Sequence, residues 1–514
     1  MGFLEKLKSN LAKLRTVYDL AAFCYDYLIE VVKDQEWFIG QYVLVNDRAT
    51  KVNPNIKQLA RFCKKVECCF METDCDEEHE ALRFSGCMSK IVKAVSSIEK
   101  KLQPYEEEEL NFATVPLYIL YAIDRYLSES QMPRPRRMPK NSSYMDNSYI
   151  YLTPKHNILD DAEEQLKFSD VIQPLLIRNQ LRNIIILERE ELNGKQPPNV
   201  VTLQIPQNDK DRRSVLERKK LRIALIPFEK EEMVQFPPTG GGAMFRVEYT
   251  EWYRNHGKEY ALKMLDMAIR QKANIVVFPE YVCEPSVQKD IGKHLNELYK
   301  TKPKFMKNLL LVVAGSGWTD DDNNVSCIYS YNGHLLGKQY KEAKYNKIDE
   351  KGNSYVEGLK NPGRETTICE AEGIGDVMFA ICRDVSDSRK LAPVVERFRP
   401  QFLLVPAWSP SIHKGFEQQL GNFAAQNHRT CSMVCNCCEA FGTFQEKRDI
   451  AGIVVTPMKE GSLVKGKADF IPRNAECCIK GACGGCVWMM DLCFEVNKVE
   501  KKKIVCGKKQ KKCE

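Results

Sequence analysis

The chain alternates short apolar runs with amphipathic stretches from residue 221 onward, and this alternation limits its fold more than any other feature. The apolar runs carry many β-branched and aromatic residues, which is typical of buried strands. They lie at 221–226, 274–278, 309–314, 326–331, 377–381, 402–405, 432–434 and 453–455. Helical patterns at 252–272, 286–300, 387–398 and 416–426 separate some of these runs. Strands that alternate with helices predict an α/β domain.

Two of the predicted strands end in residues that can carry chemistry. The run 377–381 stops at Cys382, and the run that starts at Ile275 stops at Glu280. Because the carboxyl ends of strands in an open α/β sheet border one crevice, the thiol and the carboxylate can face each other. A thiol nucleophile needs a base or a nearby positive charge. Glu280 is therefore a candidate base, and a lysine would help to stabilise an oxyanion.

Three short motifs follow one another along this domain. They are Phe-Pro-Glu at 278–280, Gly-Lys-Gln-Tyr-Lys at 337–341 and Ile-Cys-Arg-Asp at 381–384. Weaker matches surround them at 332–341, 403–408, 423–427 and 452–457. In this order and at these spacings, the set resembles the nitrilase, or carbon–nitrogen hydrolase, superfamily over residues 221–497.

The resemblance implies a fold and three catalytic roles. The fold would be a four-layer α-β-β-α sandwich, an arrangement that tends to self-associate, so we expect a homo-oligomer. Cys382 would be the nucleophile, Glu280 the general base and Lys341 the residue that stabilises the tetrahedral oxyanion. Lys344 is a rival for the lysine, because the two residues after Lys341 differ from the family's usual His-Leu pair.

Three further residues are expected to bind substrate or support the site. Glu357 resembles the family's additional active-site glutamate and would position the lysine or the substrate, with a plain loop glutamate as the alternative. The backbone N–H of Arg383 would be a second oxyanion donor. The Arg383 side chain either binds a substrate carboxylate or forms a structural ion pair. Trp408 closes the strand that would follow the cysteine helix.

These assignments predict hydrolysis of a non-peptide carbon–nitrogen bond in a small-molecule amide or nitrile, through a thioester acyl-enzyme. An amidase is preferred over a true nitrilase, and no cofactor is expected. The alternative is a catalytically idle module that serves binding or assembly, with the N-terminal region recruiting a partner. Acyl transfer to an amine or a lipid is a third interpretation.

The rest of the chain divides by composition. Residues 1–127 carry apolar residues at helical spacing and predict a helical N-terminal domain. Residues 128–157 are rich in proline and arginine and indicate a linker or long loop. Residues 158–220 form a mixed connecting region with strand patterns at 183–187 and 200–205, and residues 498–514 read as a basic tail.

The composition of the chain also predicts its cellular compartment and limits the kinds of partner that it can bind. The 21 cysteines and the lack of a long apolar N-terminal segment predict a reducing, cytoplasmic compartment. No apolar stretch approaches the length that spans a bilayer, so no membrane contact is expected. Cysteine clusters at 63–75, 431–438 and 477–486 are interpreted as packed thiols, with zinc as the alternative. The net charge of +7, with its basic linker and tail, leaves nucleic acid as the weaker choice of partner.

Overall fold

The computed structural model divides the chain into two compact units, residues 1–155 with 162–193 and residues 156–161 with 194–514. The described residues are 2–32, 55–71, 80–105, 108–129, 148–152, 184–188, 198–206, 208–217, 220–228, 233–239, 242–348, 352–363, 365–371, 374–409, 412–425, 430–437, 450–460, 463–472, 486–493 and 498–506.

The first unit is mainly helical, as the sequence predicts. Its helices are α1 (Phe3–Asn10), α2 (Val17–Val32), α4 (Ile56–Met71), α5 (Glu80–Glu99) and α6 (Glu108–Glu129). Helices α2 and α4 both pack on α6, and their apolar faces form one buried core. An antiparallel pair of strands, β1 (Ser148–Leu152) and β2 (Ile184–Glu188), completes the part of this unit that is described. Most of the predicted linker at 128–157 lies outside the described residues.

The second unit contains two large sheets, each with seven strands among the described residues. The first has the order β12 (Leu335–Tyr340), β11 (Asn324–Ser330), β10 (Leu311–Trp318), β9 (Ile275–Val277), β4 (Lys220–Leu225), β21 (Cys486–Cys493) and β22 (Lys498–Cys506). The second has the order β20 (Leu463–Pro472), β19 (Ile450–Glu460), β18 (Cys431–Asn436), β17 (Phe402–Ala407), β16 (Gly375–Phe379), β15 (Thr367–Ala371) and β3 (Asn199–Leu203).

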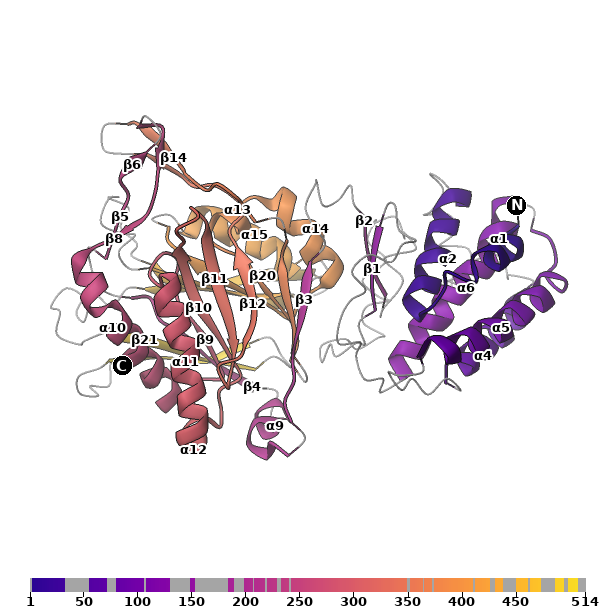
Figure 1. Ribbon diagram of the computed structural model, residues 1–514, viewed down its shortest axis with the longest axis horizontal. Coiled ribbons are helices and arrows are strands. Elements are labelled where there is room, and N and C mark those ends of the chain that lie inside the picture. The colour runs from indigo at the N-terminus through magenta and orange to yellow at the C-terminus, as the bar shows by residue number, and fades with distance from the viewer. Residues whose placement is uncertain are drawn as a thin grey trace. The chain divides into compact units, whose positions relative to one another are not determined.

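The two sheets pack face to face, and helices cover their outer faces (Figure 1). Strands β9 and β10 contact β17 across the interior. The helices of the first sheet are α10 (Glu251–Arg270), α11 (Pro285–Thr301) and α12 (Pro303–Met306), and α9 (Lys210–Glu217) lies against β4. The helices of the second sheet are α13 (Arg383–Ser386), α14 (Ser388–Phe398) and α15 (Ile412–Ala425). This is the four-layer α-β-β-α sandwich that the sequence predicted.

Local sequence explains why these elements begin where they do. Strand β9 consists of β-branched residues that are fully buried, and each such side chain stabilises the fold by about 1.5–3 kcal/mol. Helix α10 begins after Thr250, whose side chain accepts a hydrogen bond from the backbone N–H of Tyr253. Helix α11 begins with Pro285, whose fixed φ suits the first helical position.

Two strands extend the sandwich beyond the predicted range of 221–497. Residues 498–506, which the sequence assigned to a basic tail, form β22 and pair antiparallel with β21. The β-branched residues Val499, Ile504 and Val505 favour a strand here. The lysines between them led to the prediction of a basic tail, because that prediction considered charge alone. Strand β3, assigned to the connecting region, pairs in parallel with β15. Residues 507–514 lie outside the described residues.

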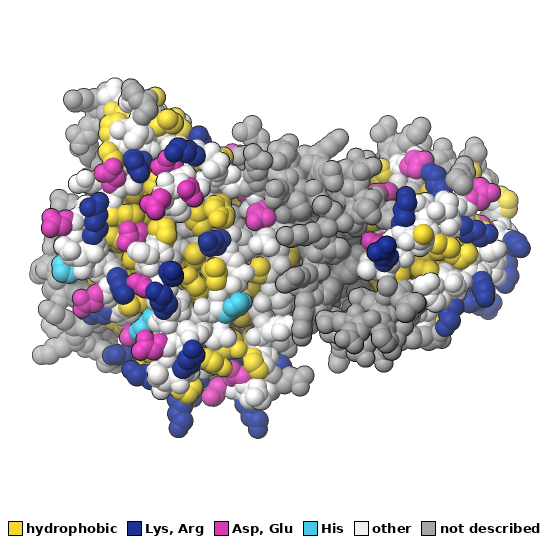
Figure 2. Space-filling view, in the orientation of Figure 1, with side chains coloured by type: hydrophobic (Ala, Val, Ile, Leu, Met, Phe, Trp, Pro, Cys, Tyr) yellow, Lys and Arg dark blue, Asp and Glu magenta, His cyan; other side chains and the backbone are white. Residues whose placement is uncertain are grey.

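A small sheet projects from one end of the sandwich (Figure 1). Its strands are β13 (Asn346–Ile348), β14 (Ser354–Glu357), β7 (Met244–Phe245) and β6 (Pro238–Thr239), and β5 (Val234–Gln235) pairs nearby with β8 (Glu248–Tyr249). The side chains of Met244 and Ile348 are exposed, and Figure 2 shows hydrophobic side chains on this projection. Strand β6 of this sheet lies within the stretch 237–242, which consists of two prolines, a threonine and three glycines.

The described cysteines are free thiols, and most of them are buried in the two cores. Cys477, Cys478 and Cys483 lie outside the described residues. Within the described ranges, no group of three or more His, Cys, Asp or Glu side chains could hold a metal ion. Among those same ranges, no helix is both long and apolar enough to cross a membrane.

Candidate active site

Four of the predicted site residues meet inside the second unit. Glu280 follows β9, Lys341 follows β12, Cys382 lies between β16 and α13, and Glu357 ends β14. All four side chains are buried, and Cys382 is the most accessible at 3%. Lys344, the rival lysine, is exposed and lies outside this cluster.

The Glu280 carboxylate is the centre of the cluster. Its Oε1 accepts hydrogen bonds from Lys341 Nζ at 2.7 Å and from Asn324 Nδ2 at 2.9 Å. Its Oε2 accepts from the backbone N–H of Trp408 at 3.0 Å. The Cys382 thiol donates to the carbonyl oxygen of Trp408, 3.6 Å from its Sγ, and the thiol and the Glu280 carboxylate influence each other's pKa.

The Lys341 ammonium is held by a second carboxylate and a phenol. Its Nζ lies 2.8 Å from Glu357 Oε2 and donates to the Tyr281 hydroxyl at 3.2 Å. The Tyr281 hydroxyl in turn donates to Glu357 Oε1 at 2.6 Å, and the backbone N–H of Tyr345 donates to Glu357 Oε2 at 3.0 Å. Glu357 therefore contacts the Lys341 ammonium, and its role as a positioning residue stays a prediction.

Burial and charge shift the proton affinities of this cluster. Burial raises the pKa of Glu280 to about 7, with Lys341 opposing the rise and Glu357 adding to it. Burial alone would lower the pKa of Lys341, but the charges of Glu280 and Glu357 raise it above its usual value, so the amine stays protonated. Burial, and then the charge of Glu280, raise the pKa of Cys382 well above its usual value. The resting cluster therefore holds a neutral thiol beside a carboxylate that can exchange protons near neutral pH.

The backbone at Cys382 is strained. Its φ of 45° and ψ of −104° lie in a region that residues with a side chain rarely adopt. The Cys382 N–H donates to the carbonyl of Pro406 at 2.9 Å. This bond and the turn that follows hold the thiol where the strand ends. Strained backbone of this kind is concentrated at functional sites.

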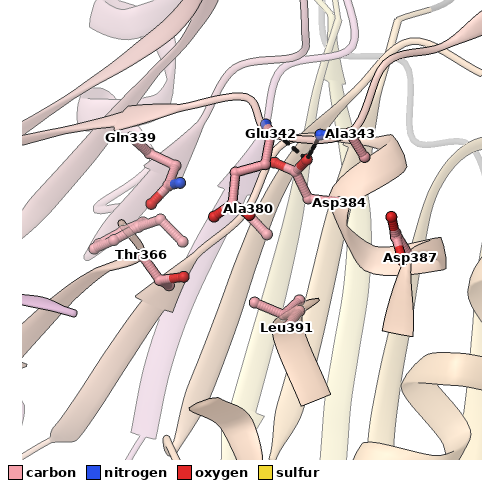
Figure 3. A pocket seen from close by; sticks show the side chains of 9 residues that line it. Gln339, Glu342, Ala343, Thr366, Ala380, Asp384, Asp387 and Leu391 are labelled. Carbon is pink, nitrogen blue, oxygen red and sulfur yellow. Dashed lines mark hydrogen bonds between the residues drawn. The ribbon is translucent and has the colours of Figure 1, made fainter. Parts of the chain in front are cut away.

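The Asp384 carboxylate ties the cysteine turn to the loop after Lys341. Its Oδ2 accepts from the N–H of Ile381 at 3.1 Å. Its Oδ1 accepts from the N–H groups of Glu342 at 3.0 Å and Ala343 at 2.7 Å, and Figure 3 shows these two bonds at the rim of a small pocket. Burial raises the pKa of this carboxyl, and its three backbone donors oppose the rise. Asp384 thus connects the two segments that carry Cys382 and Lys341.

Aromatic rings cover the cluster on the side of the projecting sheet. The Trp408 ring lies 4.7 Å from Phe236 and 6.3 Å from Tyr281, measured between centroids. Phe236 also contacts Phe245 of β7 at 5.6 Å. Trp408 therefore supports the site with its ring as well as with its backbone N–H and carbonyl.

Arg383 occupies a different position from the other predicted residues. It is the first residue of α13, and its side chain is exposed. Its charge lowers the pKa of Tyr345, opposing the effect of burial, so the guanidinium acts electrostatically near the cluster. Its side chain does not join the buried network formed by Glu280, Lys341 and Glu357.

Sequence reasoning missed Tyr281, Asn324 and Asp384. Tyr281 directly follows Glu280, and Asp384 belongs to the Ile-Cys-Arg-Asp motif, so both were adjacent to predicted residues. Asn324 stands at the start of a strand 44 positions after Glu280, and nothing local to it signals a role.

The fold and the cluster define a four-layer sandwich with a buried Glu, Lys and Cys at the ends of its strands. No protein-family model and no curated relative matches the chain. Solved structures similar to it include an amidase from Nesterenkonia sp. AN1, a mutant with the acetamide moiety of fluoroacetamide covalently added at its active-site cysteine. That structure is 14% identical, covers 50% of this chain and 94% of its own, and has a TM-score of 0.33.

Two further solved structures are similar over the same share of the chain. Saccharomyces cerevisiae Nit3, a member of branch 10 of the nitrilase superfamily, is 14% identical, covers 51% of this chain and 93% of its own, and has a TM-score of 0.32. A second mutant of the Nesterenkonia amidase, in complex with butyramide, is 15% identical, covers 50% and 95%, and has a TM-score of 0.30. The solved structures named here are thus an amidase and a member of the nitrilase superfamily, and the likeness does not cover the N-terminal region.

Proposed function

We propose that this protein hydrolyses a non-peptide carbon–nitrogen bond in a small amide-type substrate, through a thioester formed on Cys382. The observation that carries the proposal is the buried cluster in which Glu280 bonds to the Lys341 ammonium and to the backbone N–H of Trp408, whose carbonyl accepts from the Cys382 thiol. A base with a pKa of about 7 beside a protonated thiol suits nucleophilic catalysis near neutral pH.

The first half of the reaction forms the thioester. Glu280 takes the proton of the Cys382 thiol while the sulfur bonds to the amide carbon, and the carbonyl electron pair moves onto the oxygen. Lys341 and the backbone N–H of Arg383 stabilise this oxyanion. When the carbonyl re-forms, the carbon–nitrogen bond breaks, Glu280 gives its proton to the nitrogen, and ammonia or an amine leaves.

The second half returns the enzyme to its starting state. Glu280 takes a proton from a water molecule, and the water oxygen bonds to the thioester carbon. As this second oxyanion collapses, the carbon–sulfur bond breaks and the sulfur takes the proton back from Glu280. A carboxylic acid leaves. Glu357 and Tyr281 act throughout by holding the Lys341 ammonium in place.

The test is release of ammonia or amine from a panel of primary and secondary amides by the purified protein. Cys382→Ala is expected to abolish release, because no other described cysteine contacts both Glu280 and Lys341. Cys283→Ala is the matched control. Cys283 is also fully buried, but its pKa is raised by burial and by Cys435 and Glu284. This control is expected to keep its activity.

Mass spectrometry of the intact protein adds a second readout. An acyl adduct on a peptide containing Cys382 is expected when hydrolysis is slowed at low temperature. Full activity in the Cys382→Ala variant would show that the proposed nucleophile is wrong. If the acyl group appears mainly on an added amine such as hydroxylamine instead of on water, the reaction is acyl transfer.

A further inference from the structure

Two residues that bond to Glu280 each carry a second, buried polar atom for which no partner is described. Most buried polar atoms in folded proteins have a hydrogen-bond partner, so an unpaired one needs an explanation. Among the described residues, Asn324 Oδ1 and Trp408 Nε1 have none, although both residues bond to Glu280 through other atoms. One orphan atom is an acceptor and the other is a donor.

The orientation of the Asn324 side chain follows from chemistry. Its Nδ2 donates to Glu280 Oε1 at 2.9 Å, and the reversed amide would place two acceptor oxygens against each other. Its backbone carbonyl accepts from the N–H of Lys341 at 2.9 Å, and the residue is 1% exposed. Asn324 is therefore held between the proposed base and the proposed lysine, with a free oxygen of fixed direction.

The proposed reaction requires an N–H group at this place. The leaving nitrogen must come within hydrogen-bonding distance of Glu280, because Glu280 supplies its proton. An amide nitrogen carries at least one further hydrogen, and it gains another as it leaves. Asn324 Oδ1 belongs to an amide that already bonds to the Glu280 carboxylate, so it is a buried acceptor without a described partner next to the proposed base.

We propose that Asn324 Oδ1 accepts a hydrogen bond from the N–H of the scissile amide and so selects the leaving group. This inference rests on the function proposed above. The favoured substrates are carboxamides or ureides whose leaving nitrogen carries hydrogen. The oxygen of an ester and the nitrogen of a nitrile carry no hydrogen, so each would place lone pairs against Oδ1 and leave it unpaired.

The test compares matched substrates in full-length protein. Primary amides of propionic and benzoic acid are compared with their methyl esters in the wild type and in the Asn324→Leu variant. Losing the Asn324 bond to Glu280 slows both substrate types alike. Losing the Oδ1 acceptor slows only the amides, so kcat/KM for the amides is expected to fall about three- to tenfold further than for the esters.

A neighbouring serine provides the control. Ser326 also lies on β11, is buried and has an oxygen without a described partner, but it does not contact Glu280. Ser326→Ala is expected to leave the ratio of amide to ester hydrolysis unchanged. If Asn324→Leu does not fold, as judged by its thermal unfolding, Asn324→Ser is used in its place.

The outcomes separate the two proposals. An equal loss for amides and esters would overturn the role of Asn324 while the proposed function stands. A larger loss for esters would overturn it as well. If the wild type hydrolyses neither substrate type and forms no acyl adduct on Cys382, the proposed function fails, and the inference fails with it.

Discussion

Glu280 is the residue whose protonation should govern the reaction. Its pKa is raised by burial from 4.5 to about 7, so the ionised form that can accept the thiol proton becomes dominant only above that pH. We expect kcat/KM to rise with pH through about 7. Initial rates on one amide, measured across roughly pH 5 to 9, test this, and a flat profile would contradict it.

Glu280→Gln should lower kcat by about 10²- to 10⁴-fold.

The Tyr281 hydroxyl helps to hold the Lys341 ammonium, and a single substitution can remove it without removing the ring. Tyr281→Phe deletes the donor to Glu357 and the acceptor for Lys341 while keeping the ring. We expect kcat to fall about tenfold with little change in KM, because the ammonium is less well held in the transition state. Steady-state kinetics on a primary amide provide the measurement.

Tyr253→Phe is the matched control for this prediction. Tyr253 is equally buried and its hydroxyl donates to the carbonyl of Val282 at 2.7 Å, with no contact to the cluster. The control should lose about 1 kcal/mol of stability and keep its kcat. Equal losses of kcat in both variants would show that Tyr281 has only a packing role.

At the scale of elements, Asp384 joins the β12 side of the site to the β16 side. Asp384→Asn keeps one acceptor oxygen but replaces the other with an NH₂ group. This NH₂ group faces backbone N–H groups that donate to the carboxylate in the wild type. The loop after Lys341 and the Cys382 turn should shift relative to each other. We expect kcat to fall about 10²-fold, and Cys382 to react more slowly with iodoacetamide in the absence of substrate.

The control for this element is Asp387→Asn. Asp387 directly precedes α14, three residues after Asp384, but it accepts none of the three backbone hydrogen bonds that Asp384 accepts. In the Asp387→Asn variant, Cys382 should react with iodoacetamide at the wild-type rate. If the Asp384→Asn variant kept both the wild-type kcat and the wild-type reactivity of Cys382, the link between the two segments would not contribute to catalysis.

The same elements show which parts of the fold and of the candidate site could be predicted from the sequence. The strand ends that present Glu280 and Cys382 could be predicted, because apolar runs with polar ends are local patterns. The contribution of Asn324 could not, since it depends on a hydrogen bond to Glu280, 44 residues earlier in the chain. Strand β22 was hidden by its lysines. A strand was predicted at 200–205, where β3 lies, but its pairing with β15, more than 160 residues later, could not be predicted.

At the scale of the whole molecule, several expectations from sequence stay predictions. They are a homo-oligomer, a cytoplasmic compartment and a partner recruited by the N-terminal region. The second unit has its own extensive core and contains every residue of the candidate site. It should therefore work without the helical unit, because folding and catalysis both depend on contacts inside it.

The boundary of the working unit is the last point that an experiment can decide. A fragment of residues 194–514 retains β3 and α9, whereas a fragment of residues 221–514 loses both. The shorter fragment exposes the edge of β15 that now pairs with β3. It also loses Arg212, which donates to the carbonyls of Leu309 at 2.9 Å and Met306 at 2.7 Å and lies 3.8 Å above the Tyr331 ring.

We expect the 194–514 fragment to unfold cooperatively and to release ammonia from an amide at the rate of the full chain. The 221–514 fragment should unfold at a lower temperature and aggregate, because an unpaired strand edge templates association and several buried contacts are gone. Thermal unfolding and size-exclusion chromatography of both fragments provide the measurement. Equal stability of the two would mean that β3 and α9 add nothing to the sandwich, and loss of activity in the longer one would mean that the helical unit completes the enzyme.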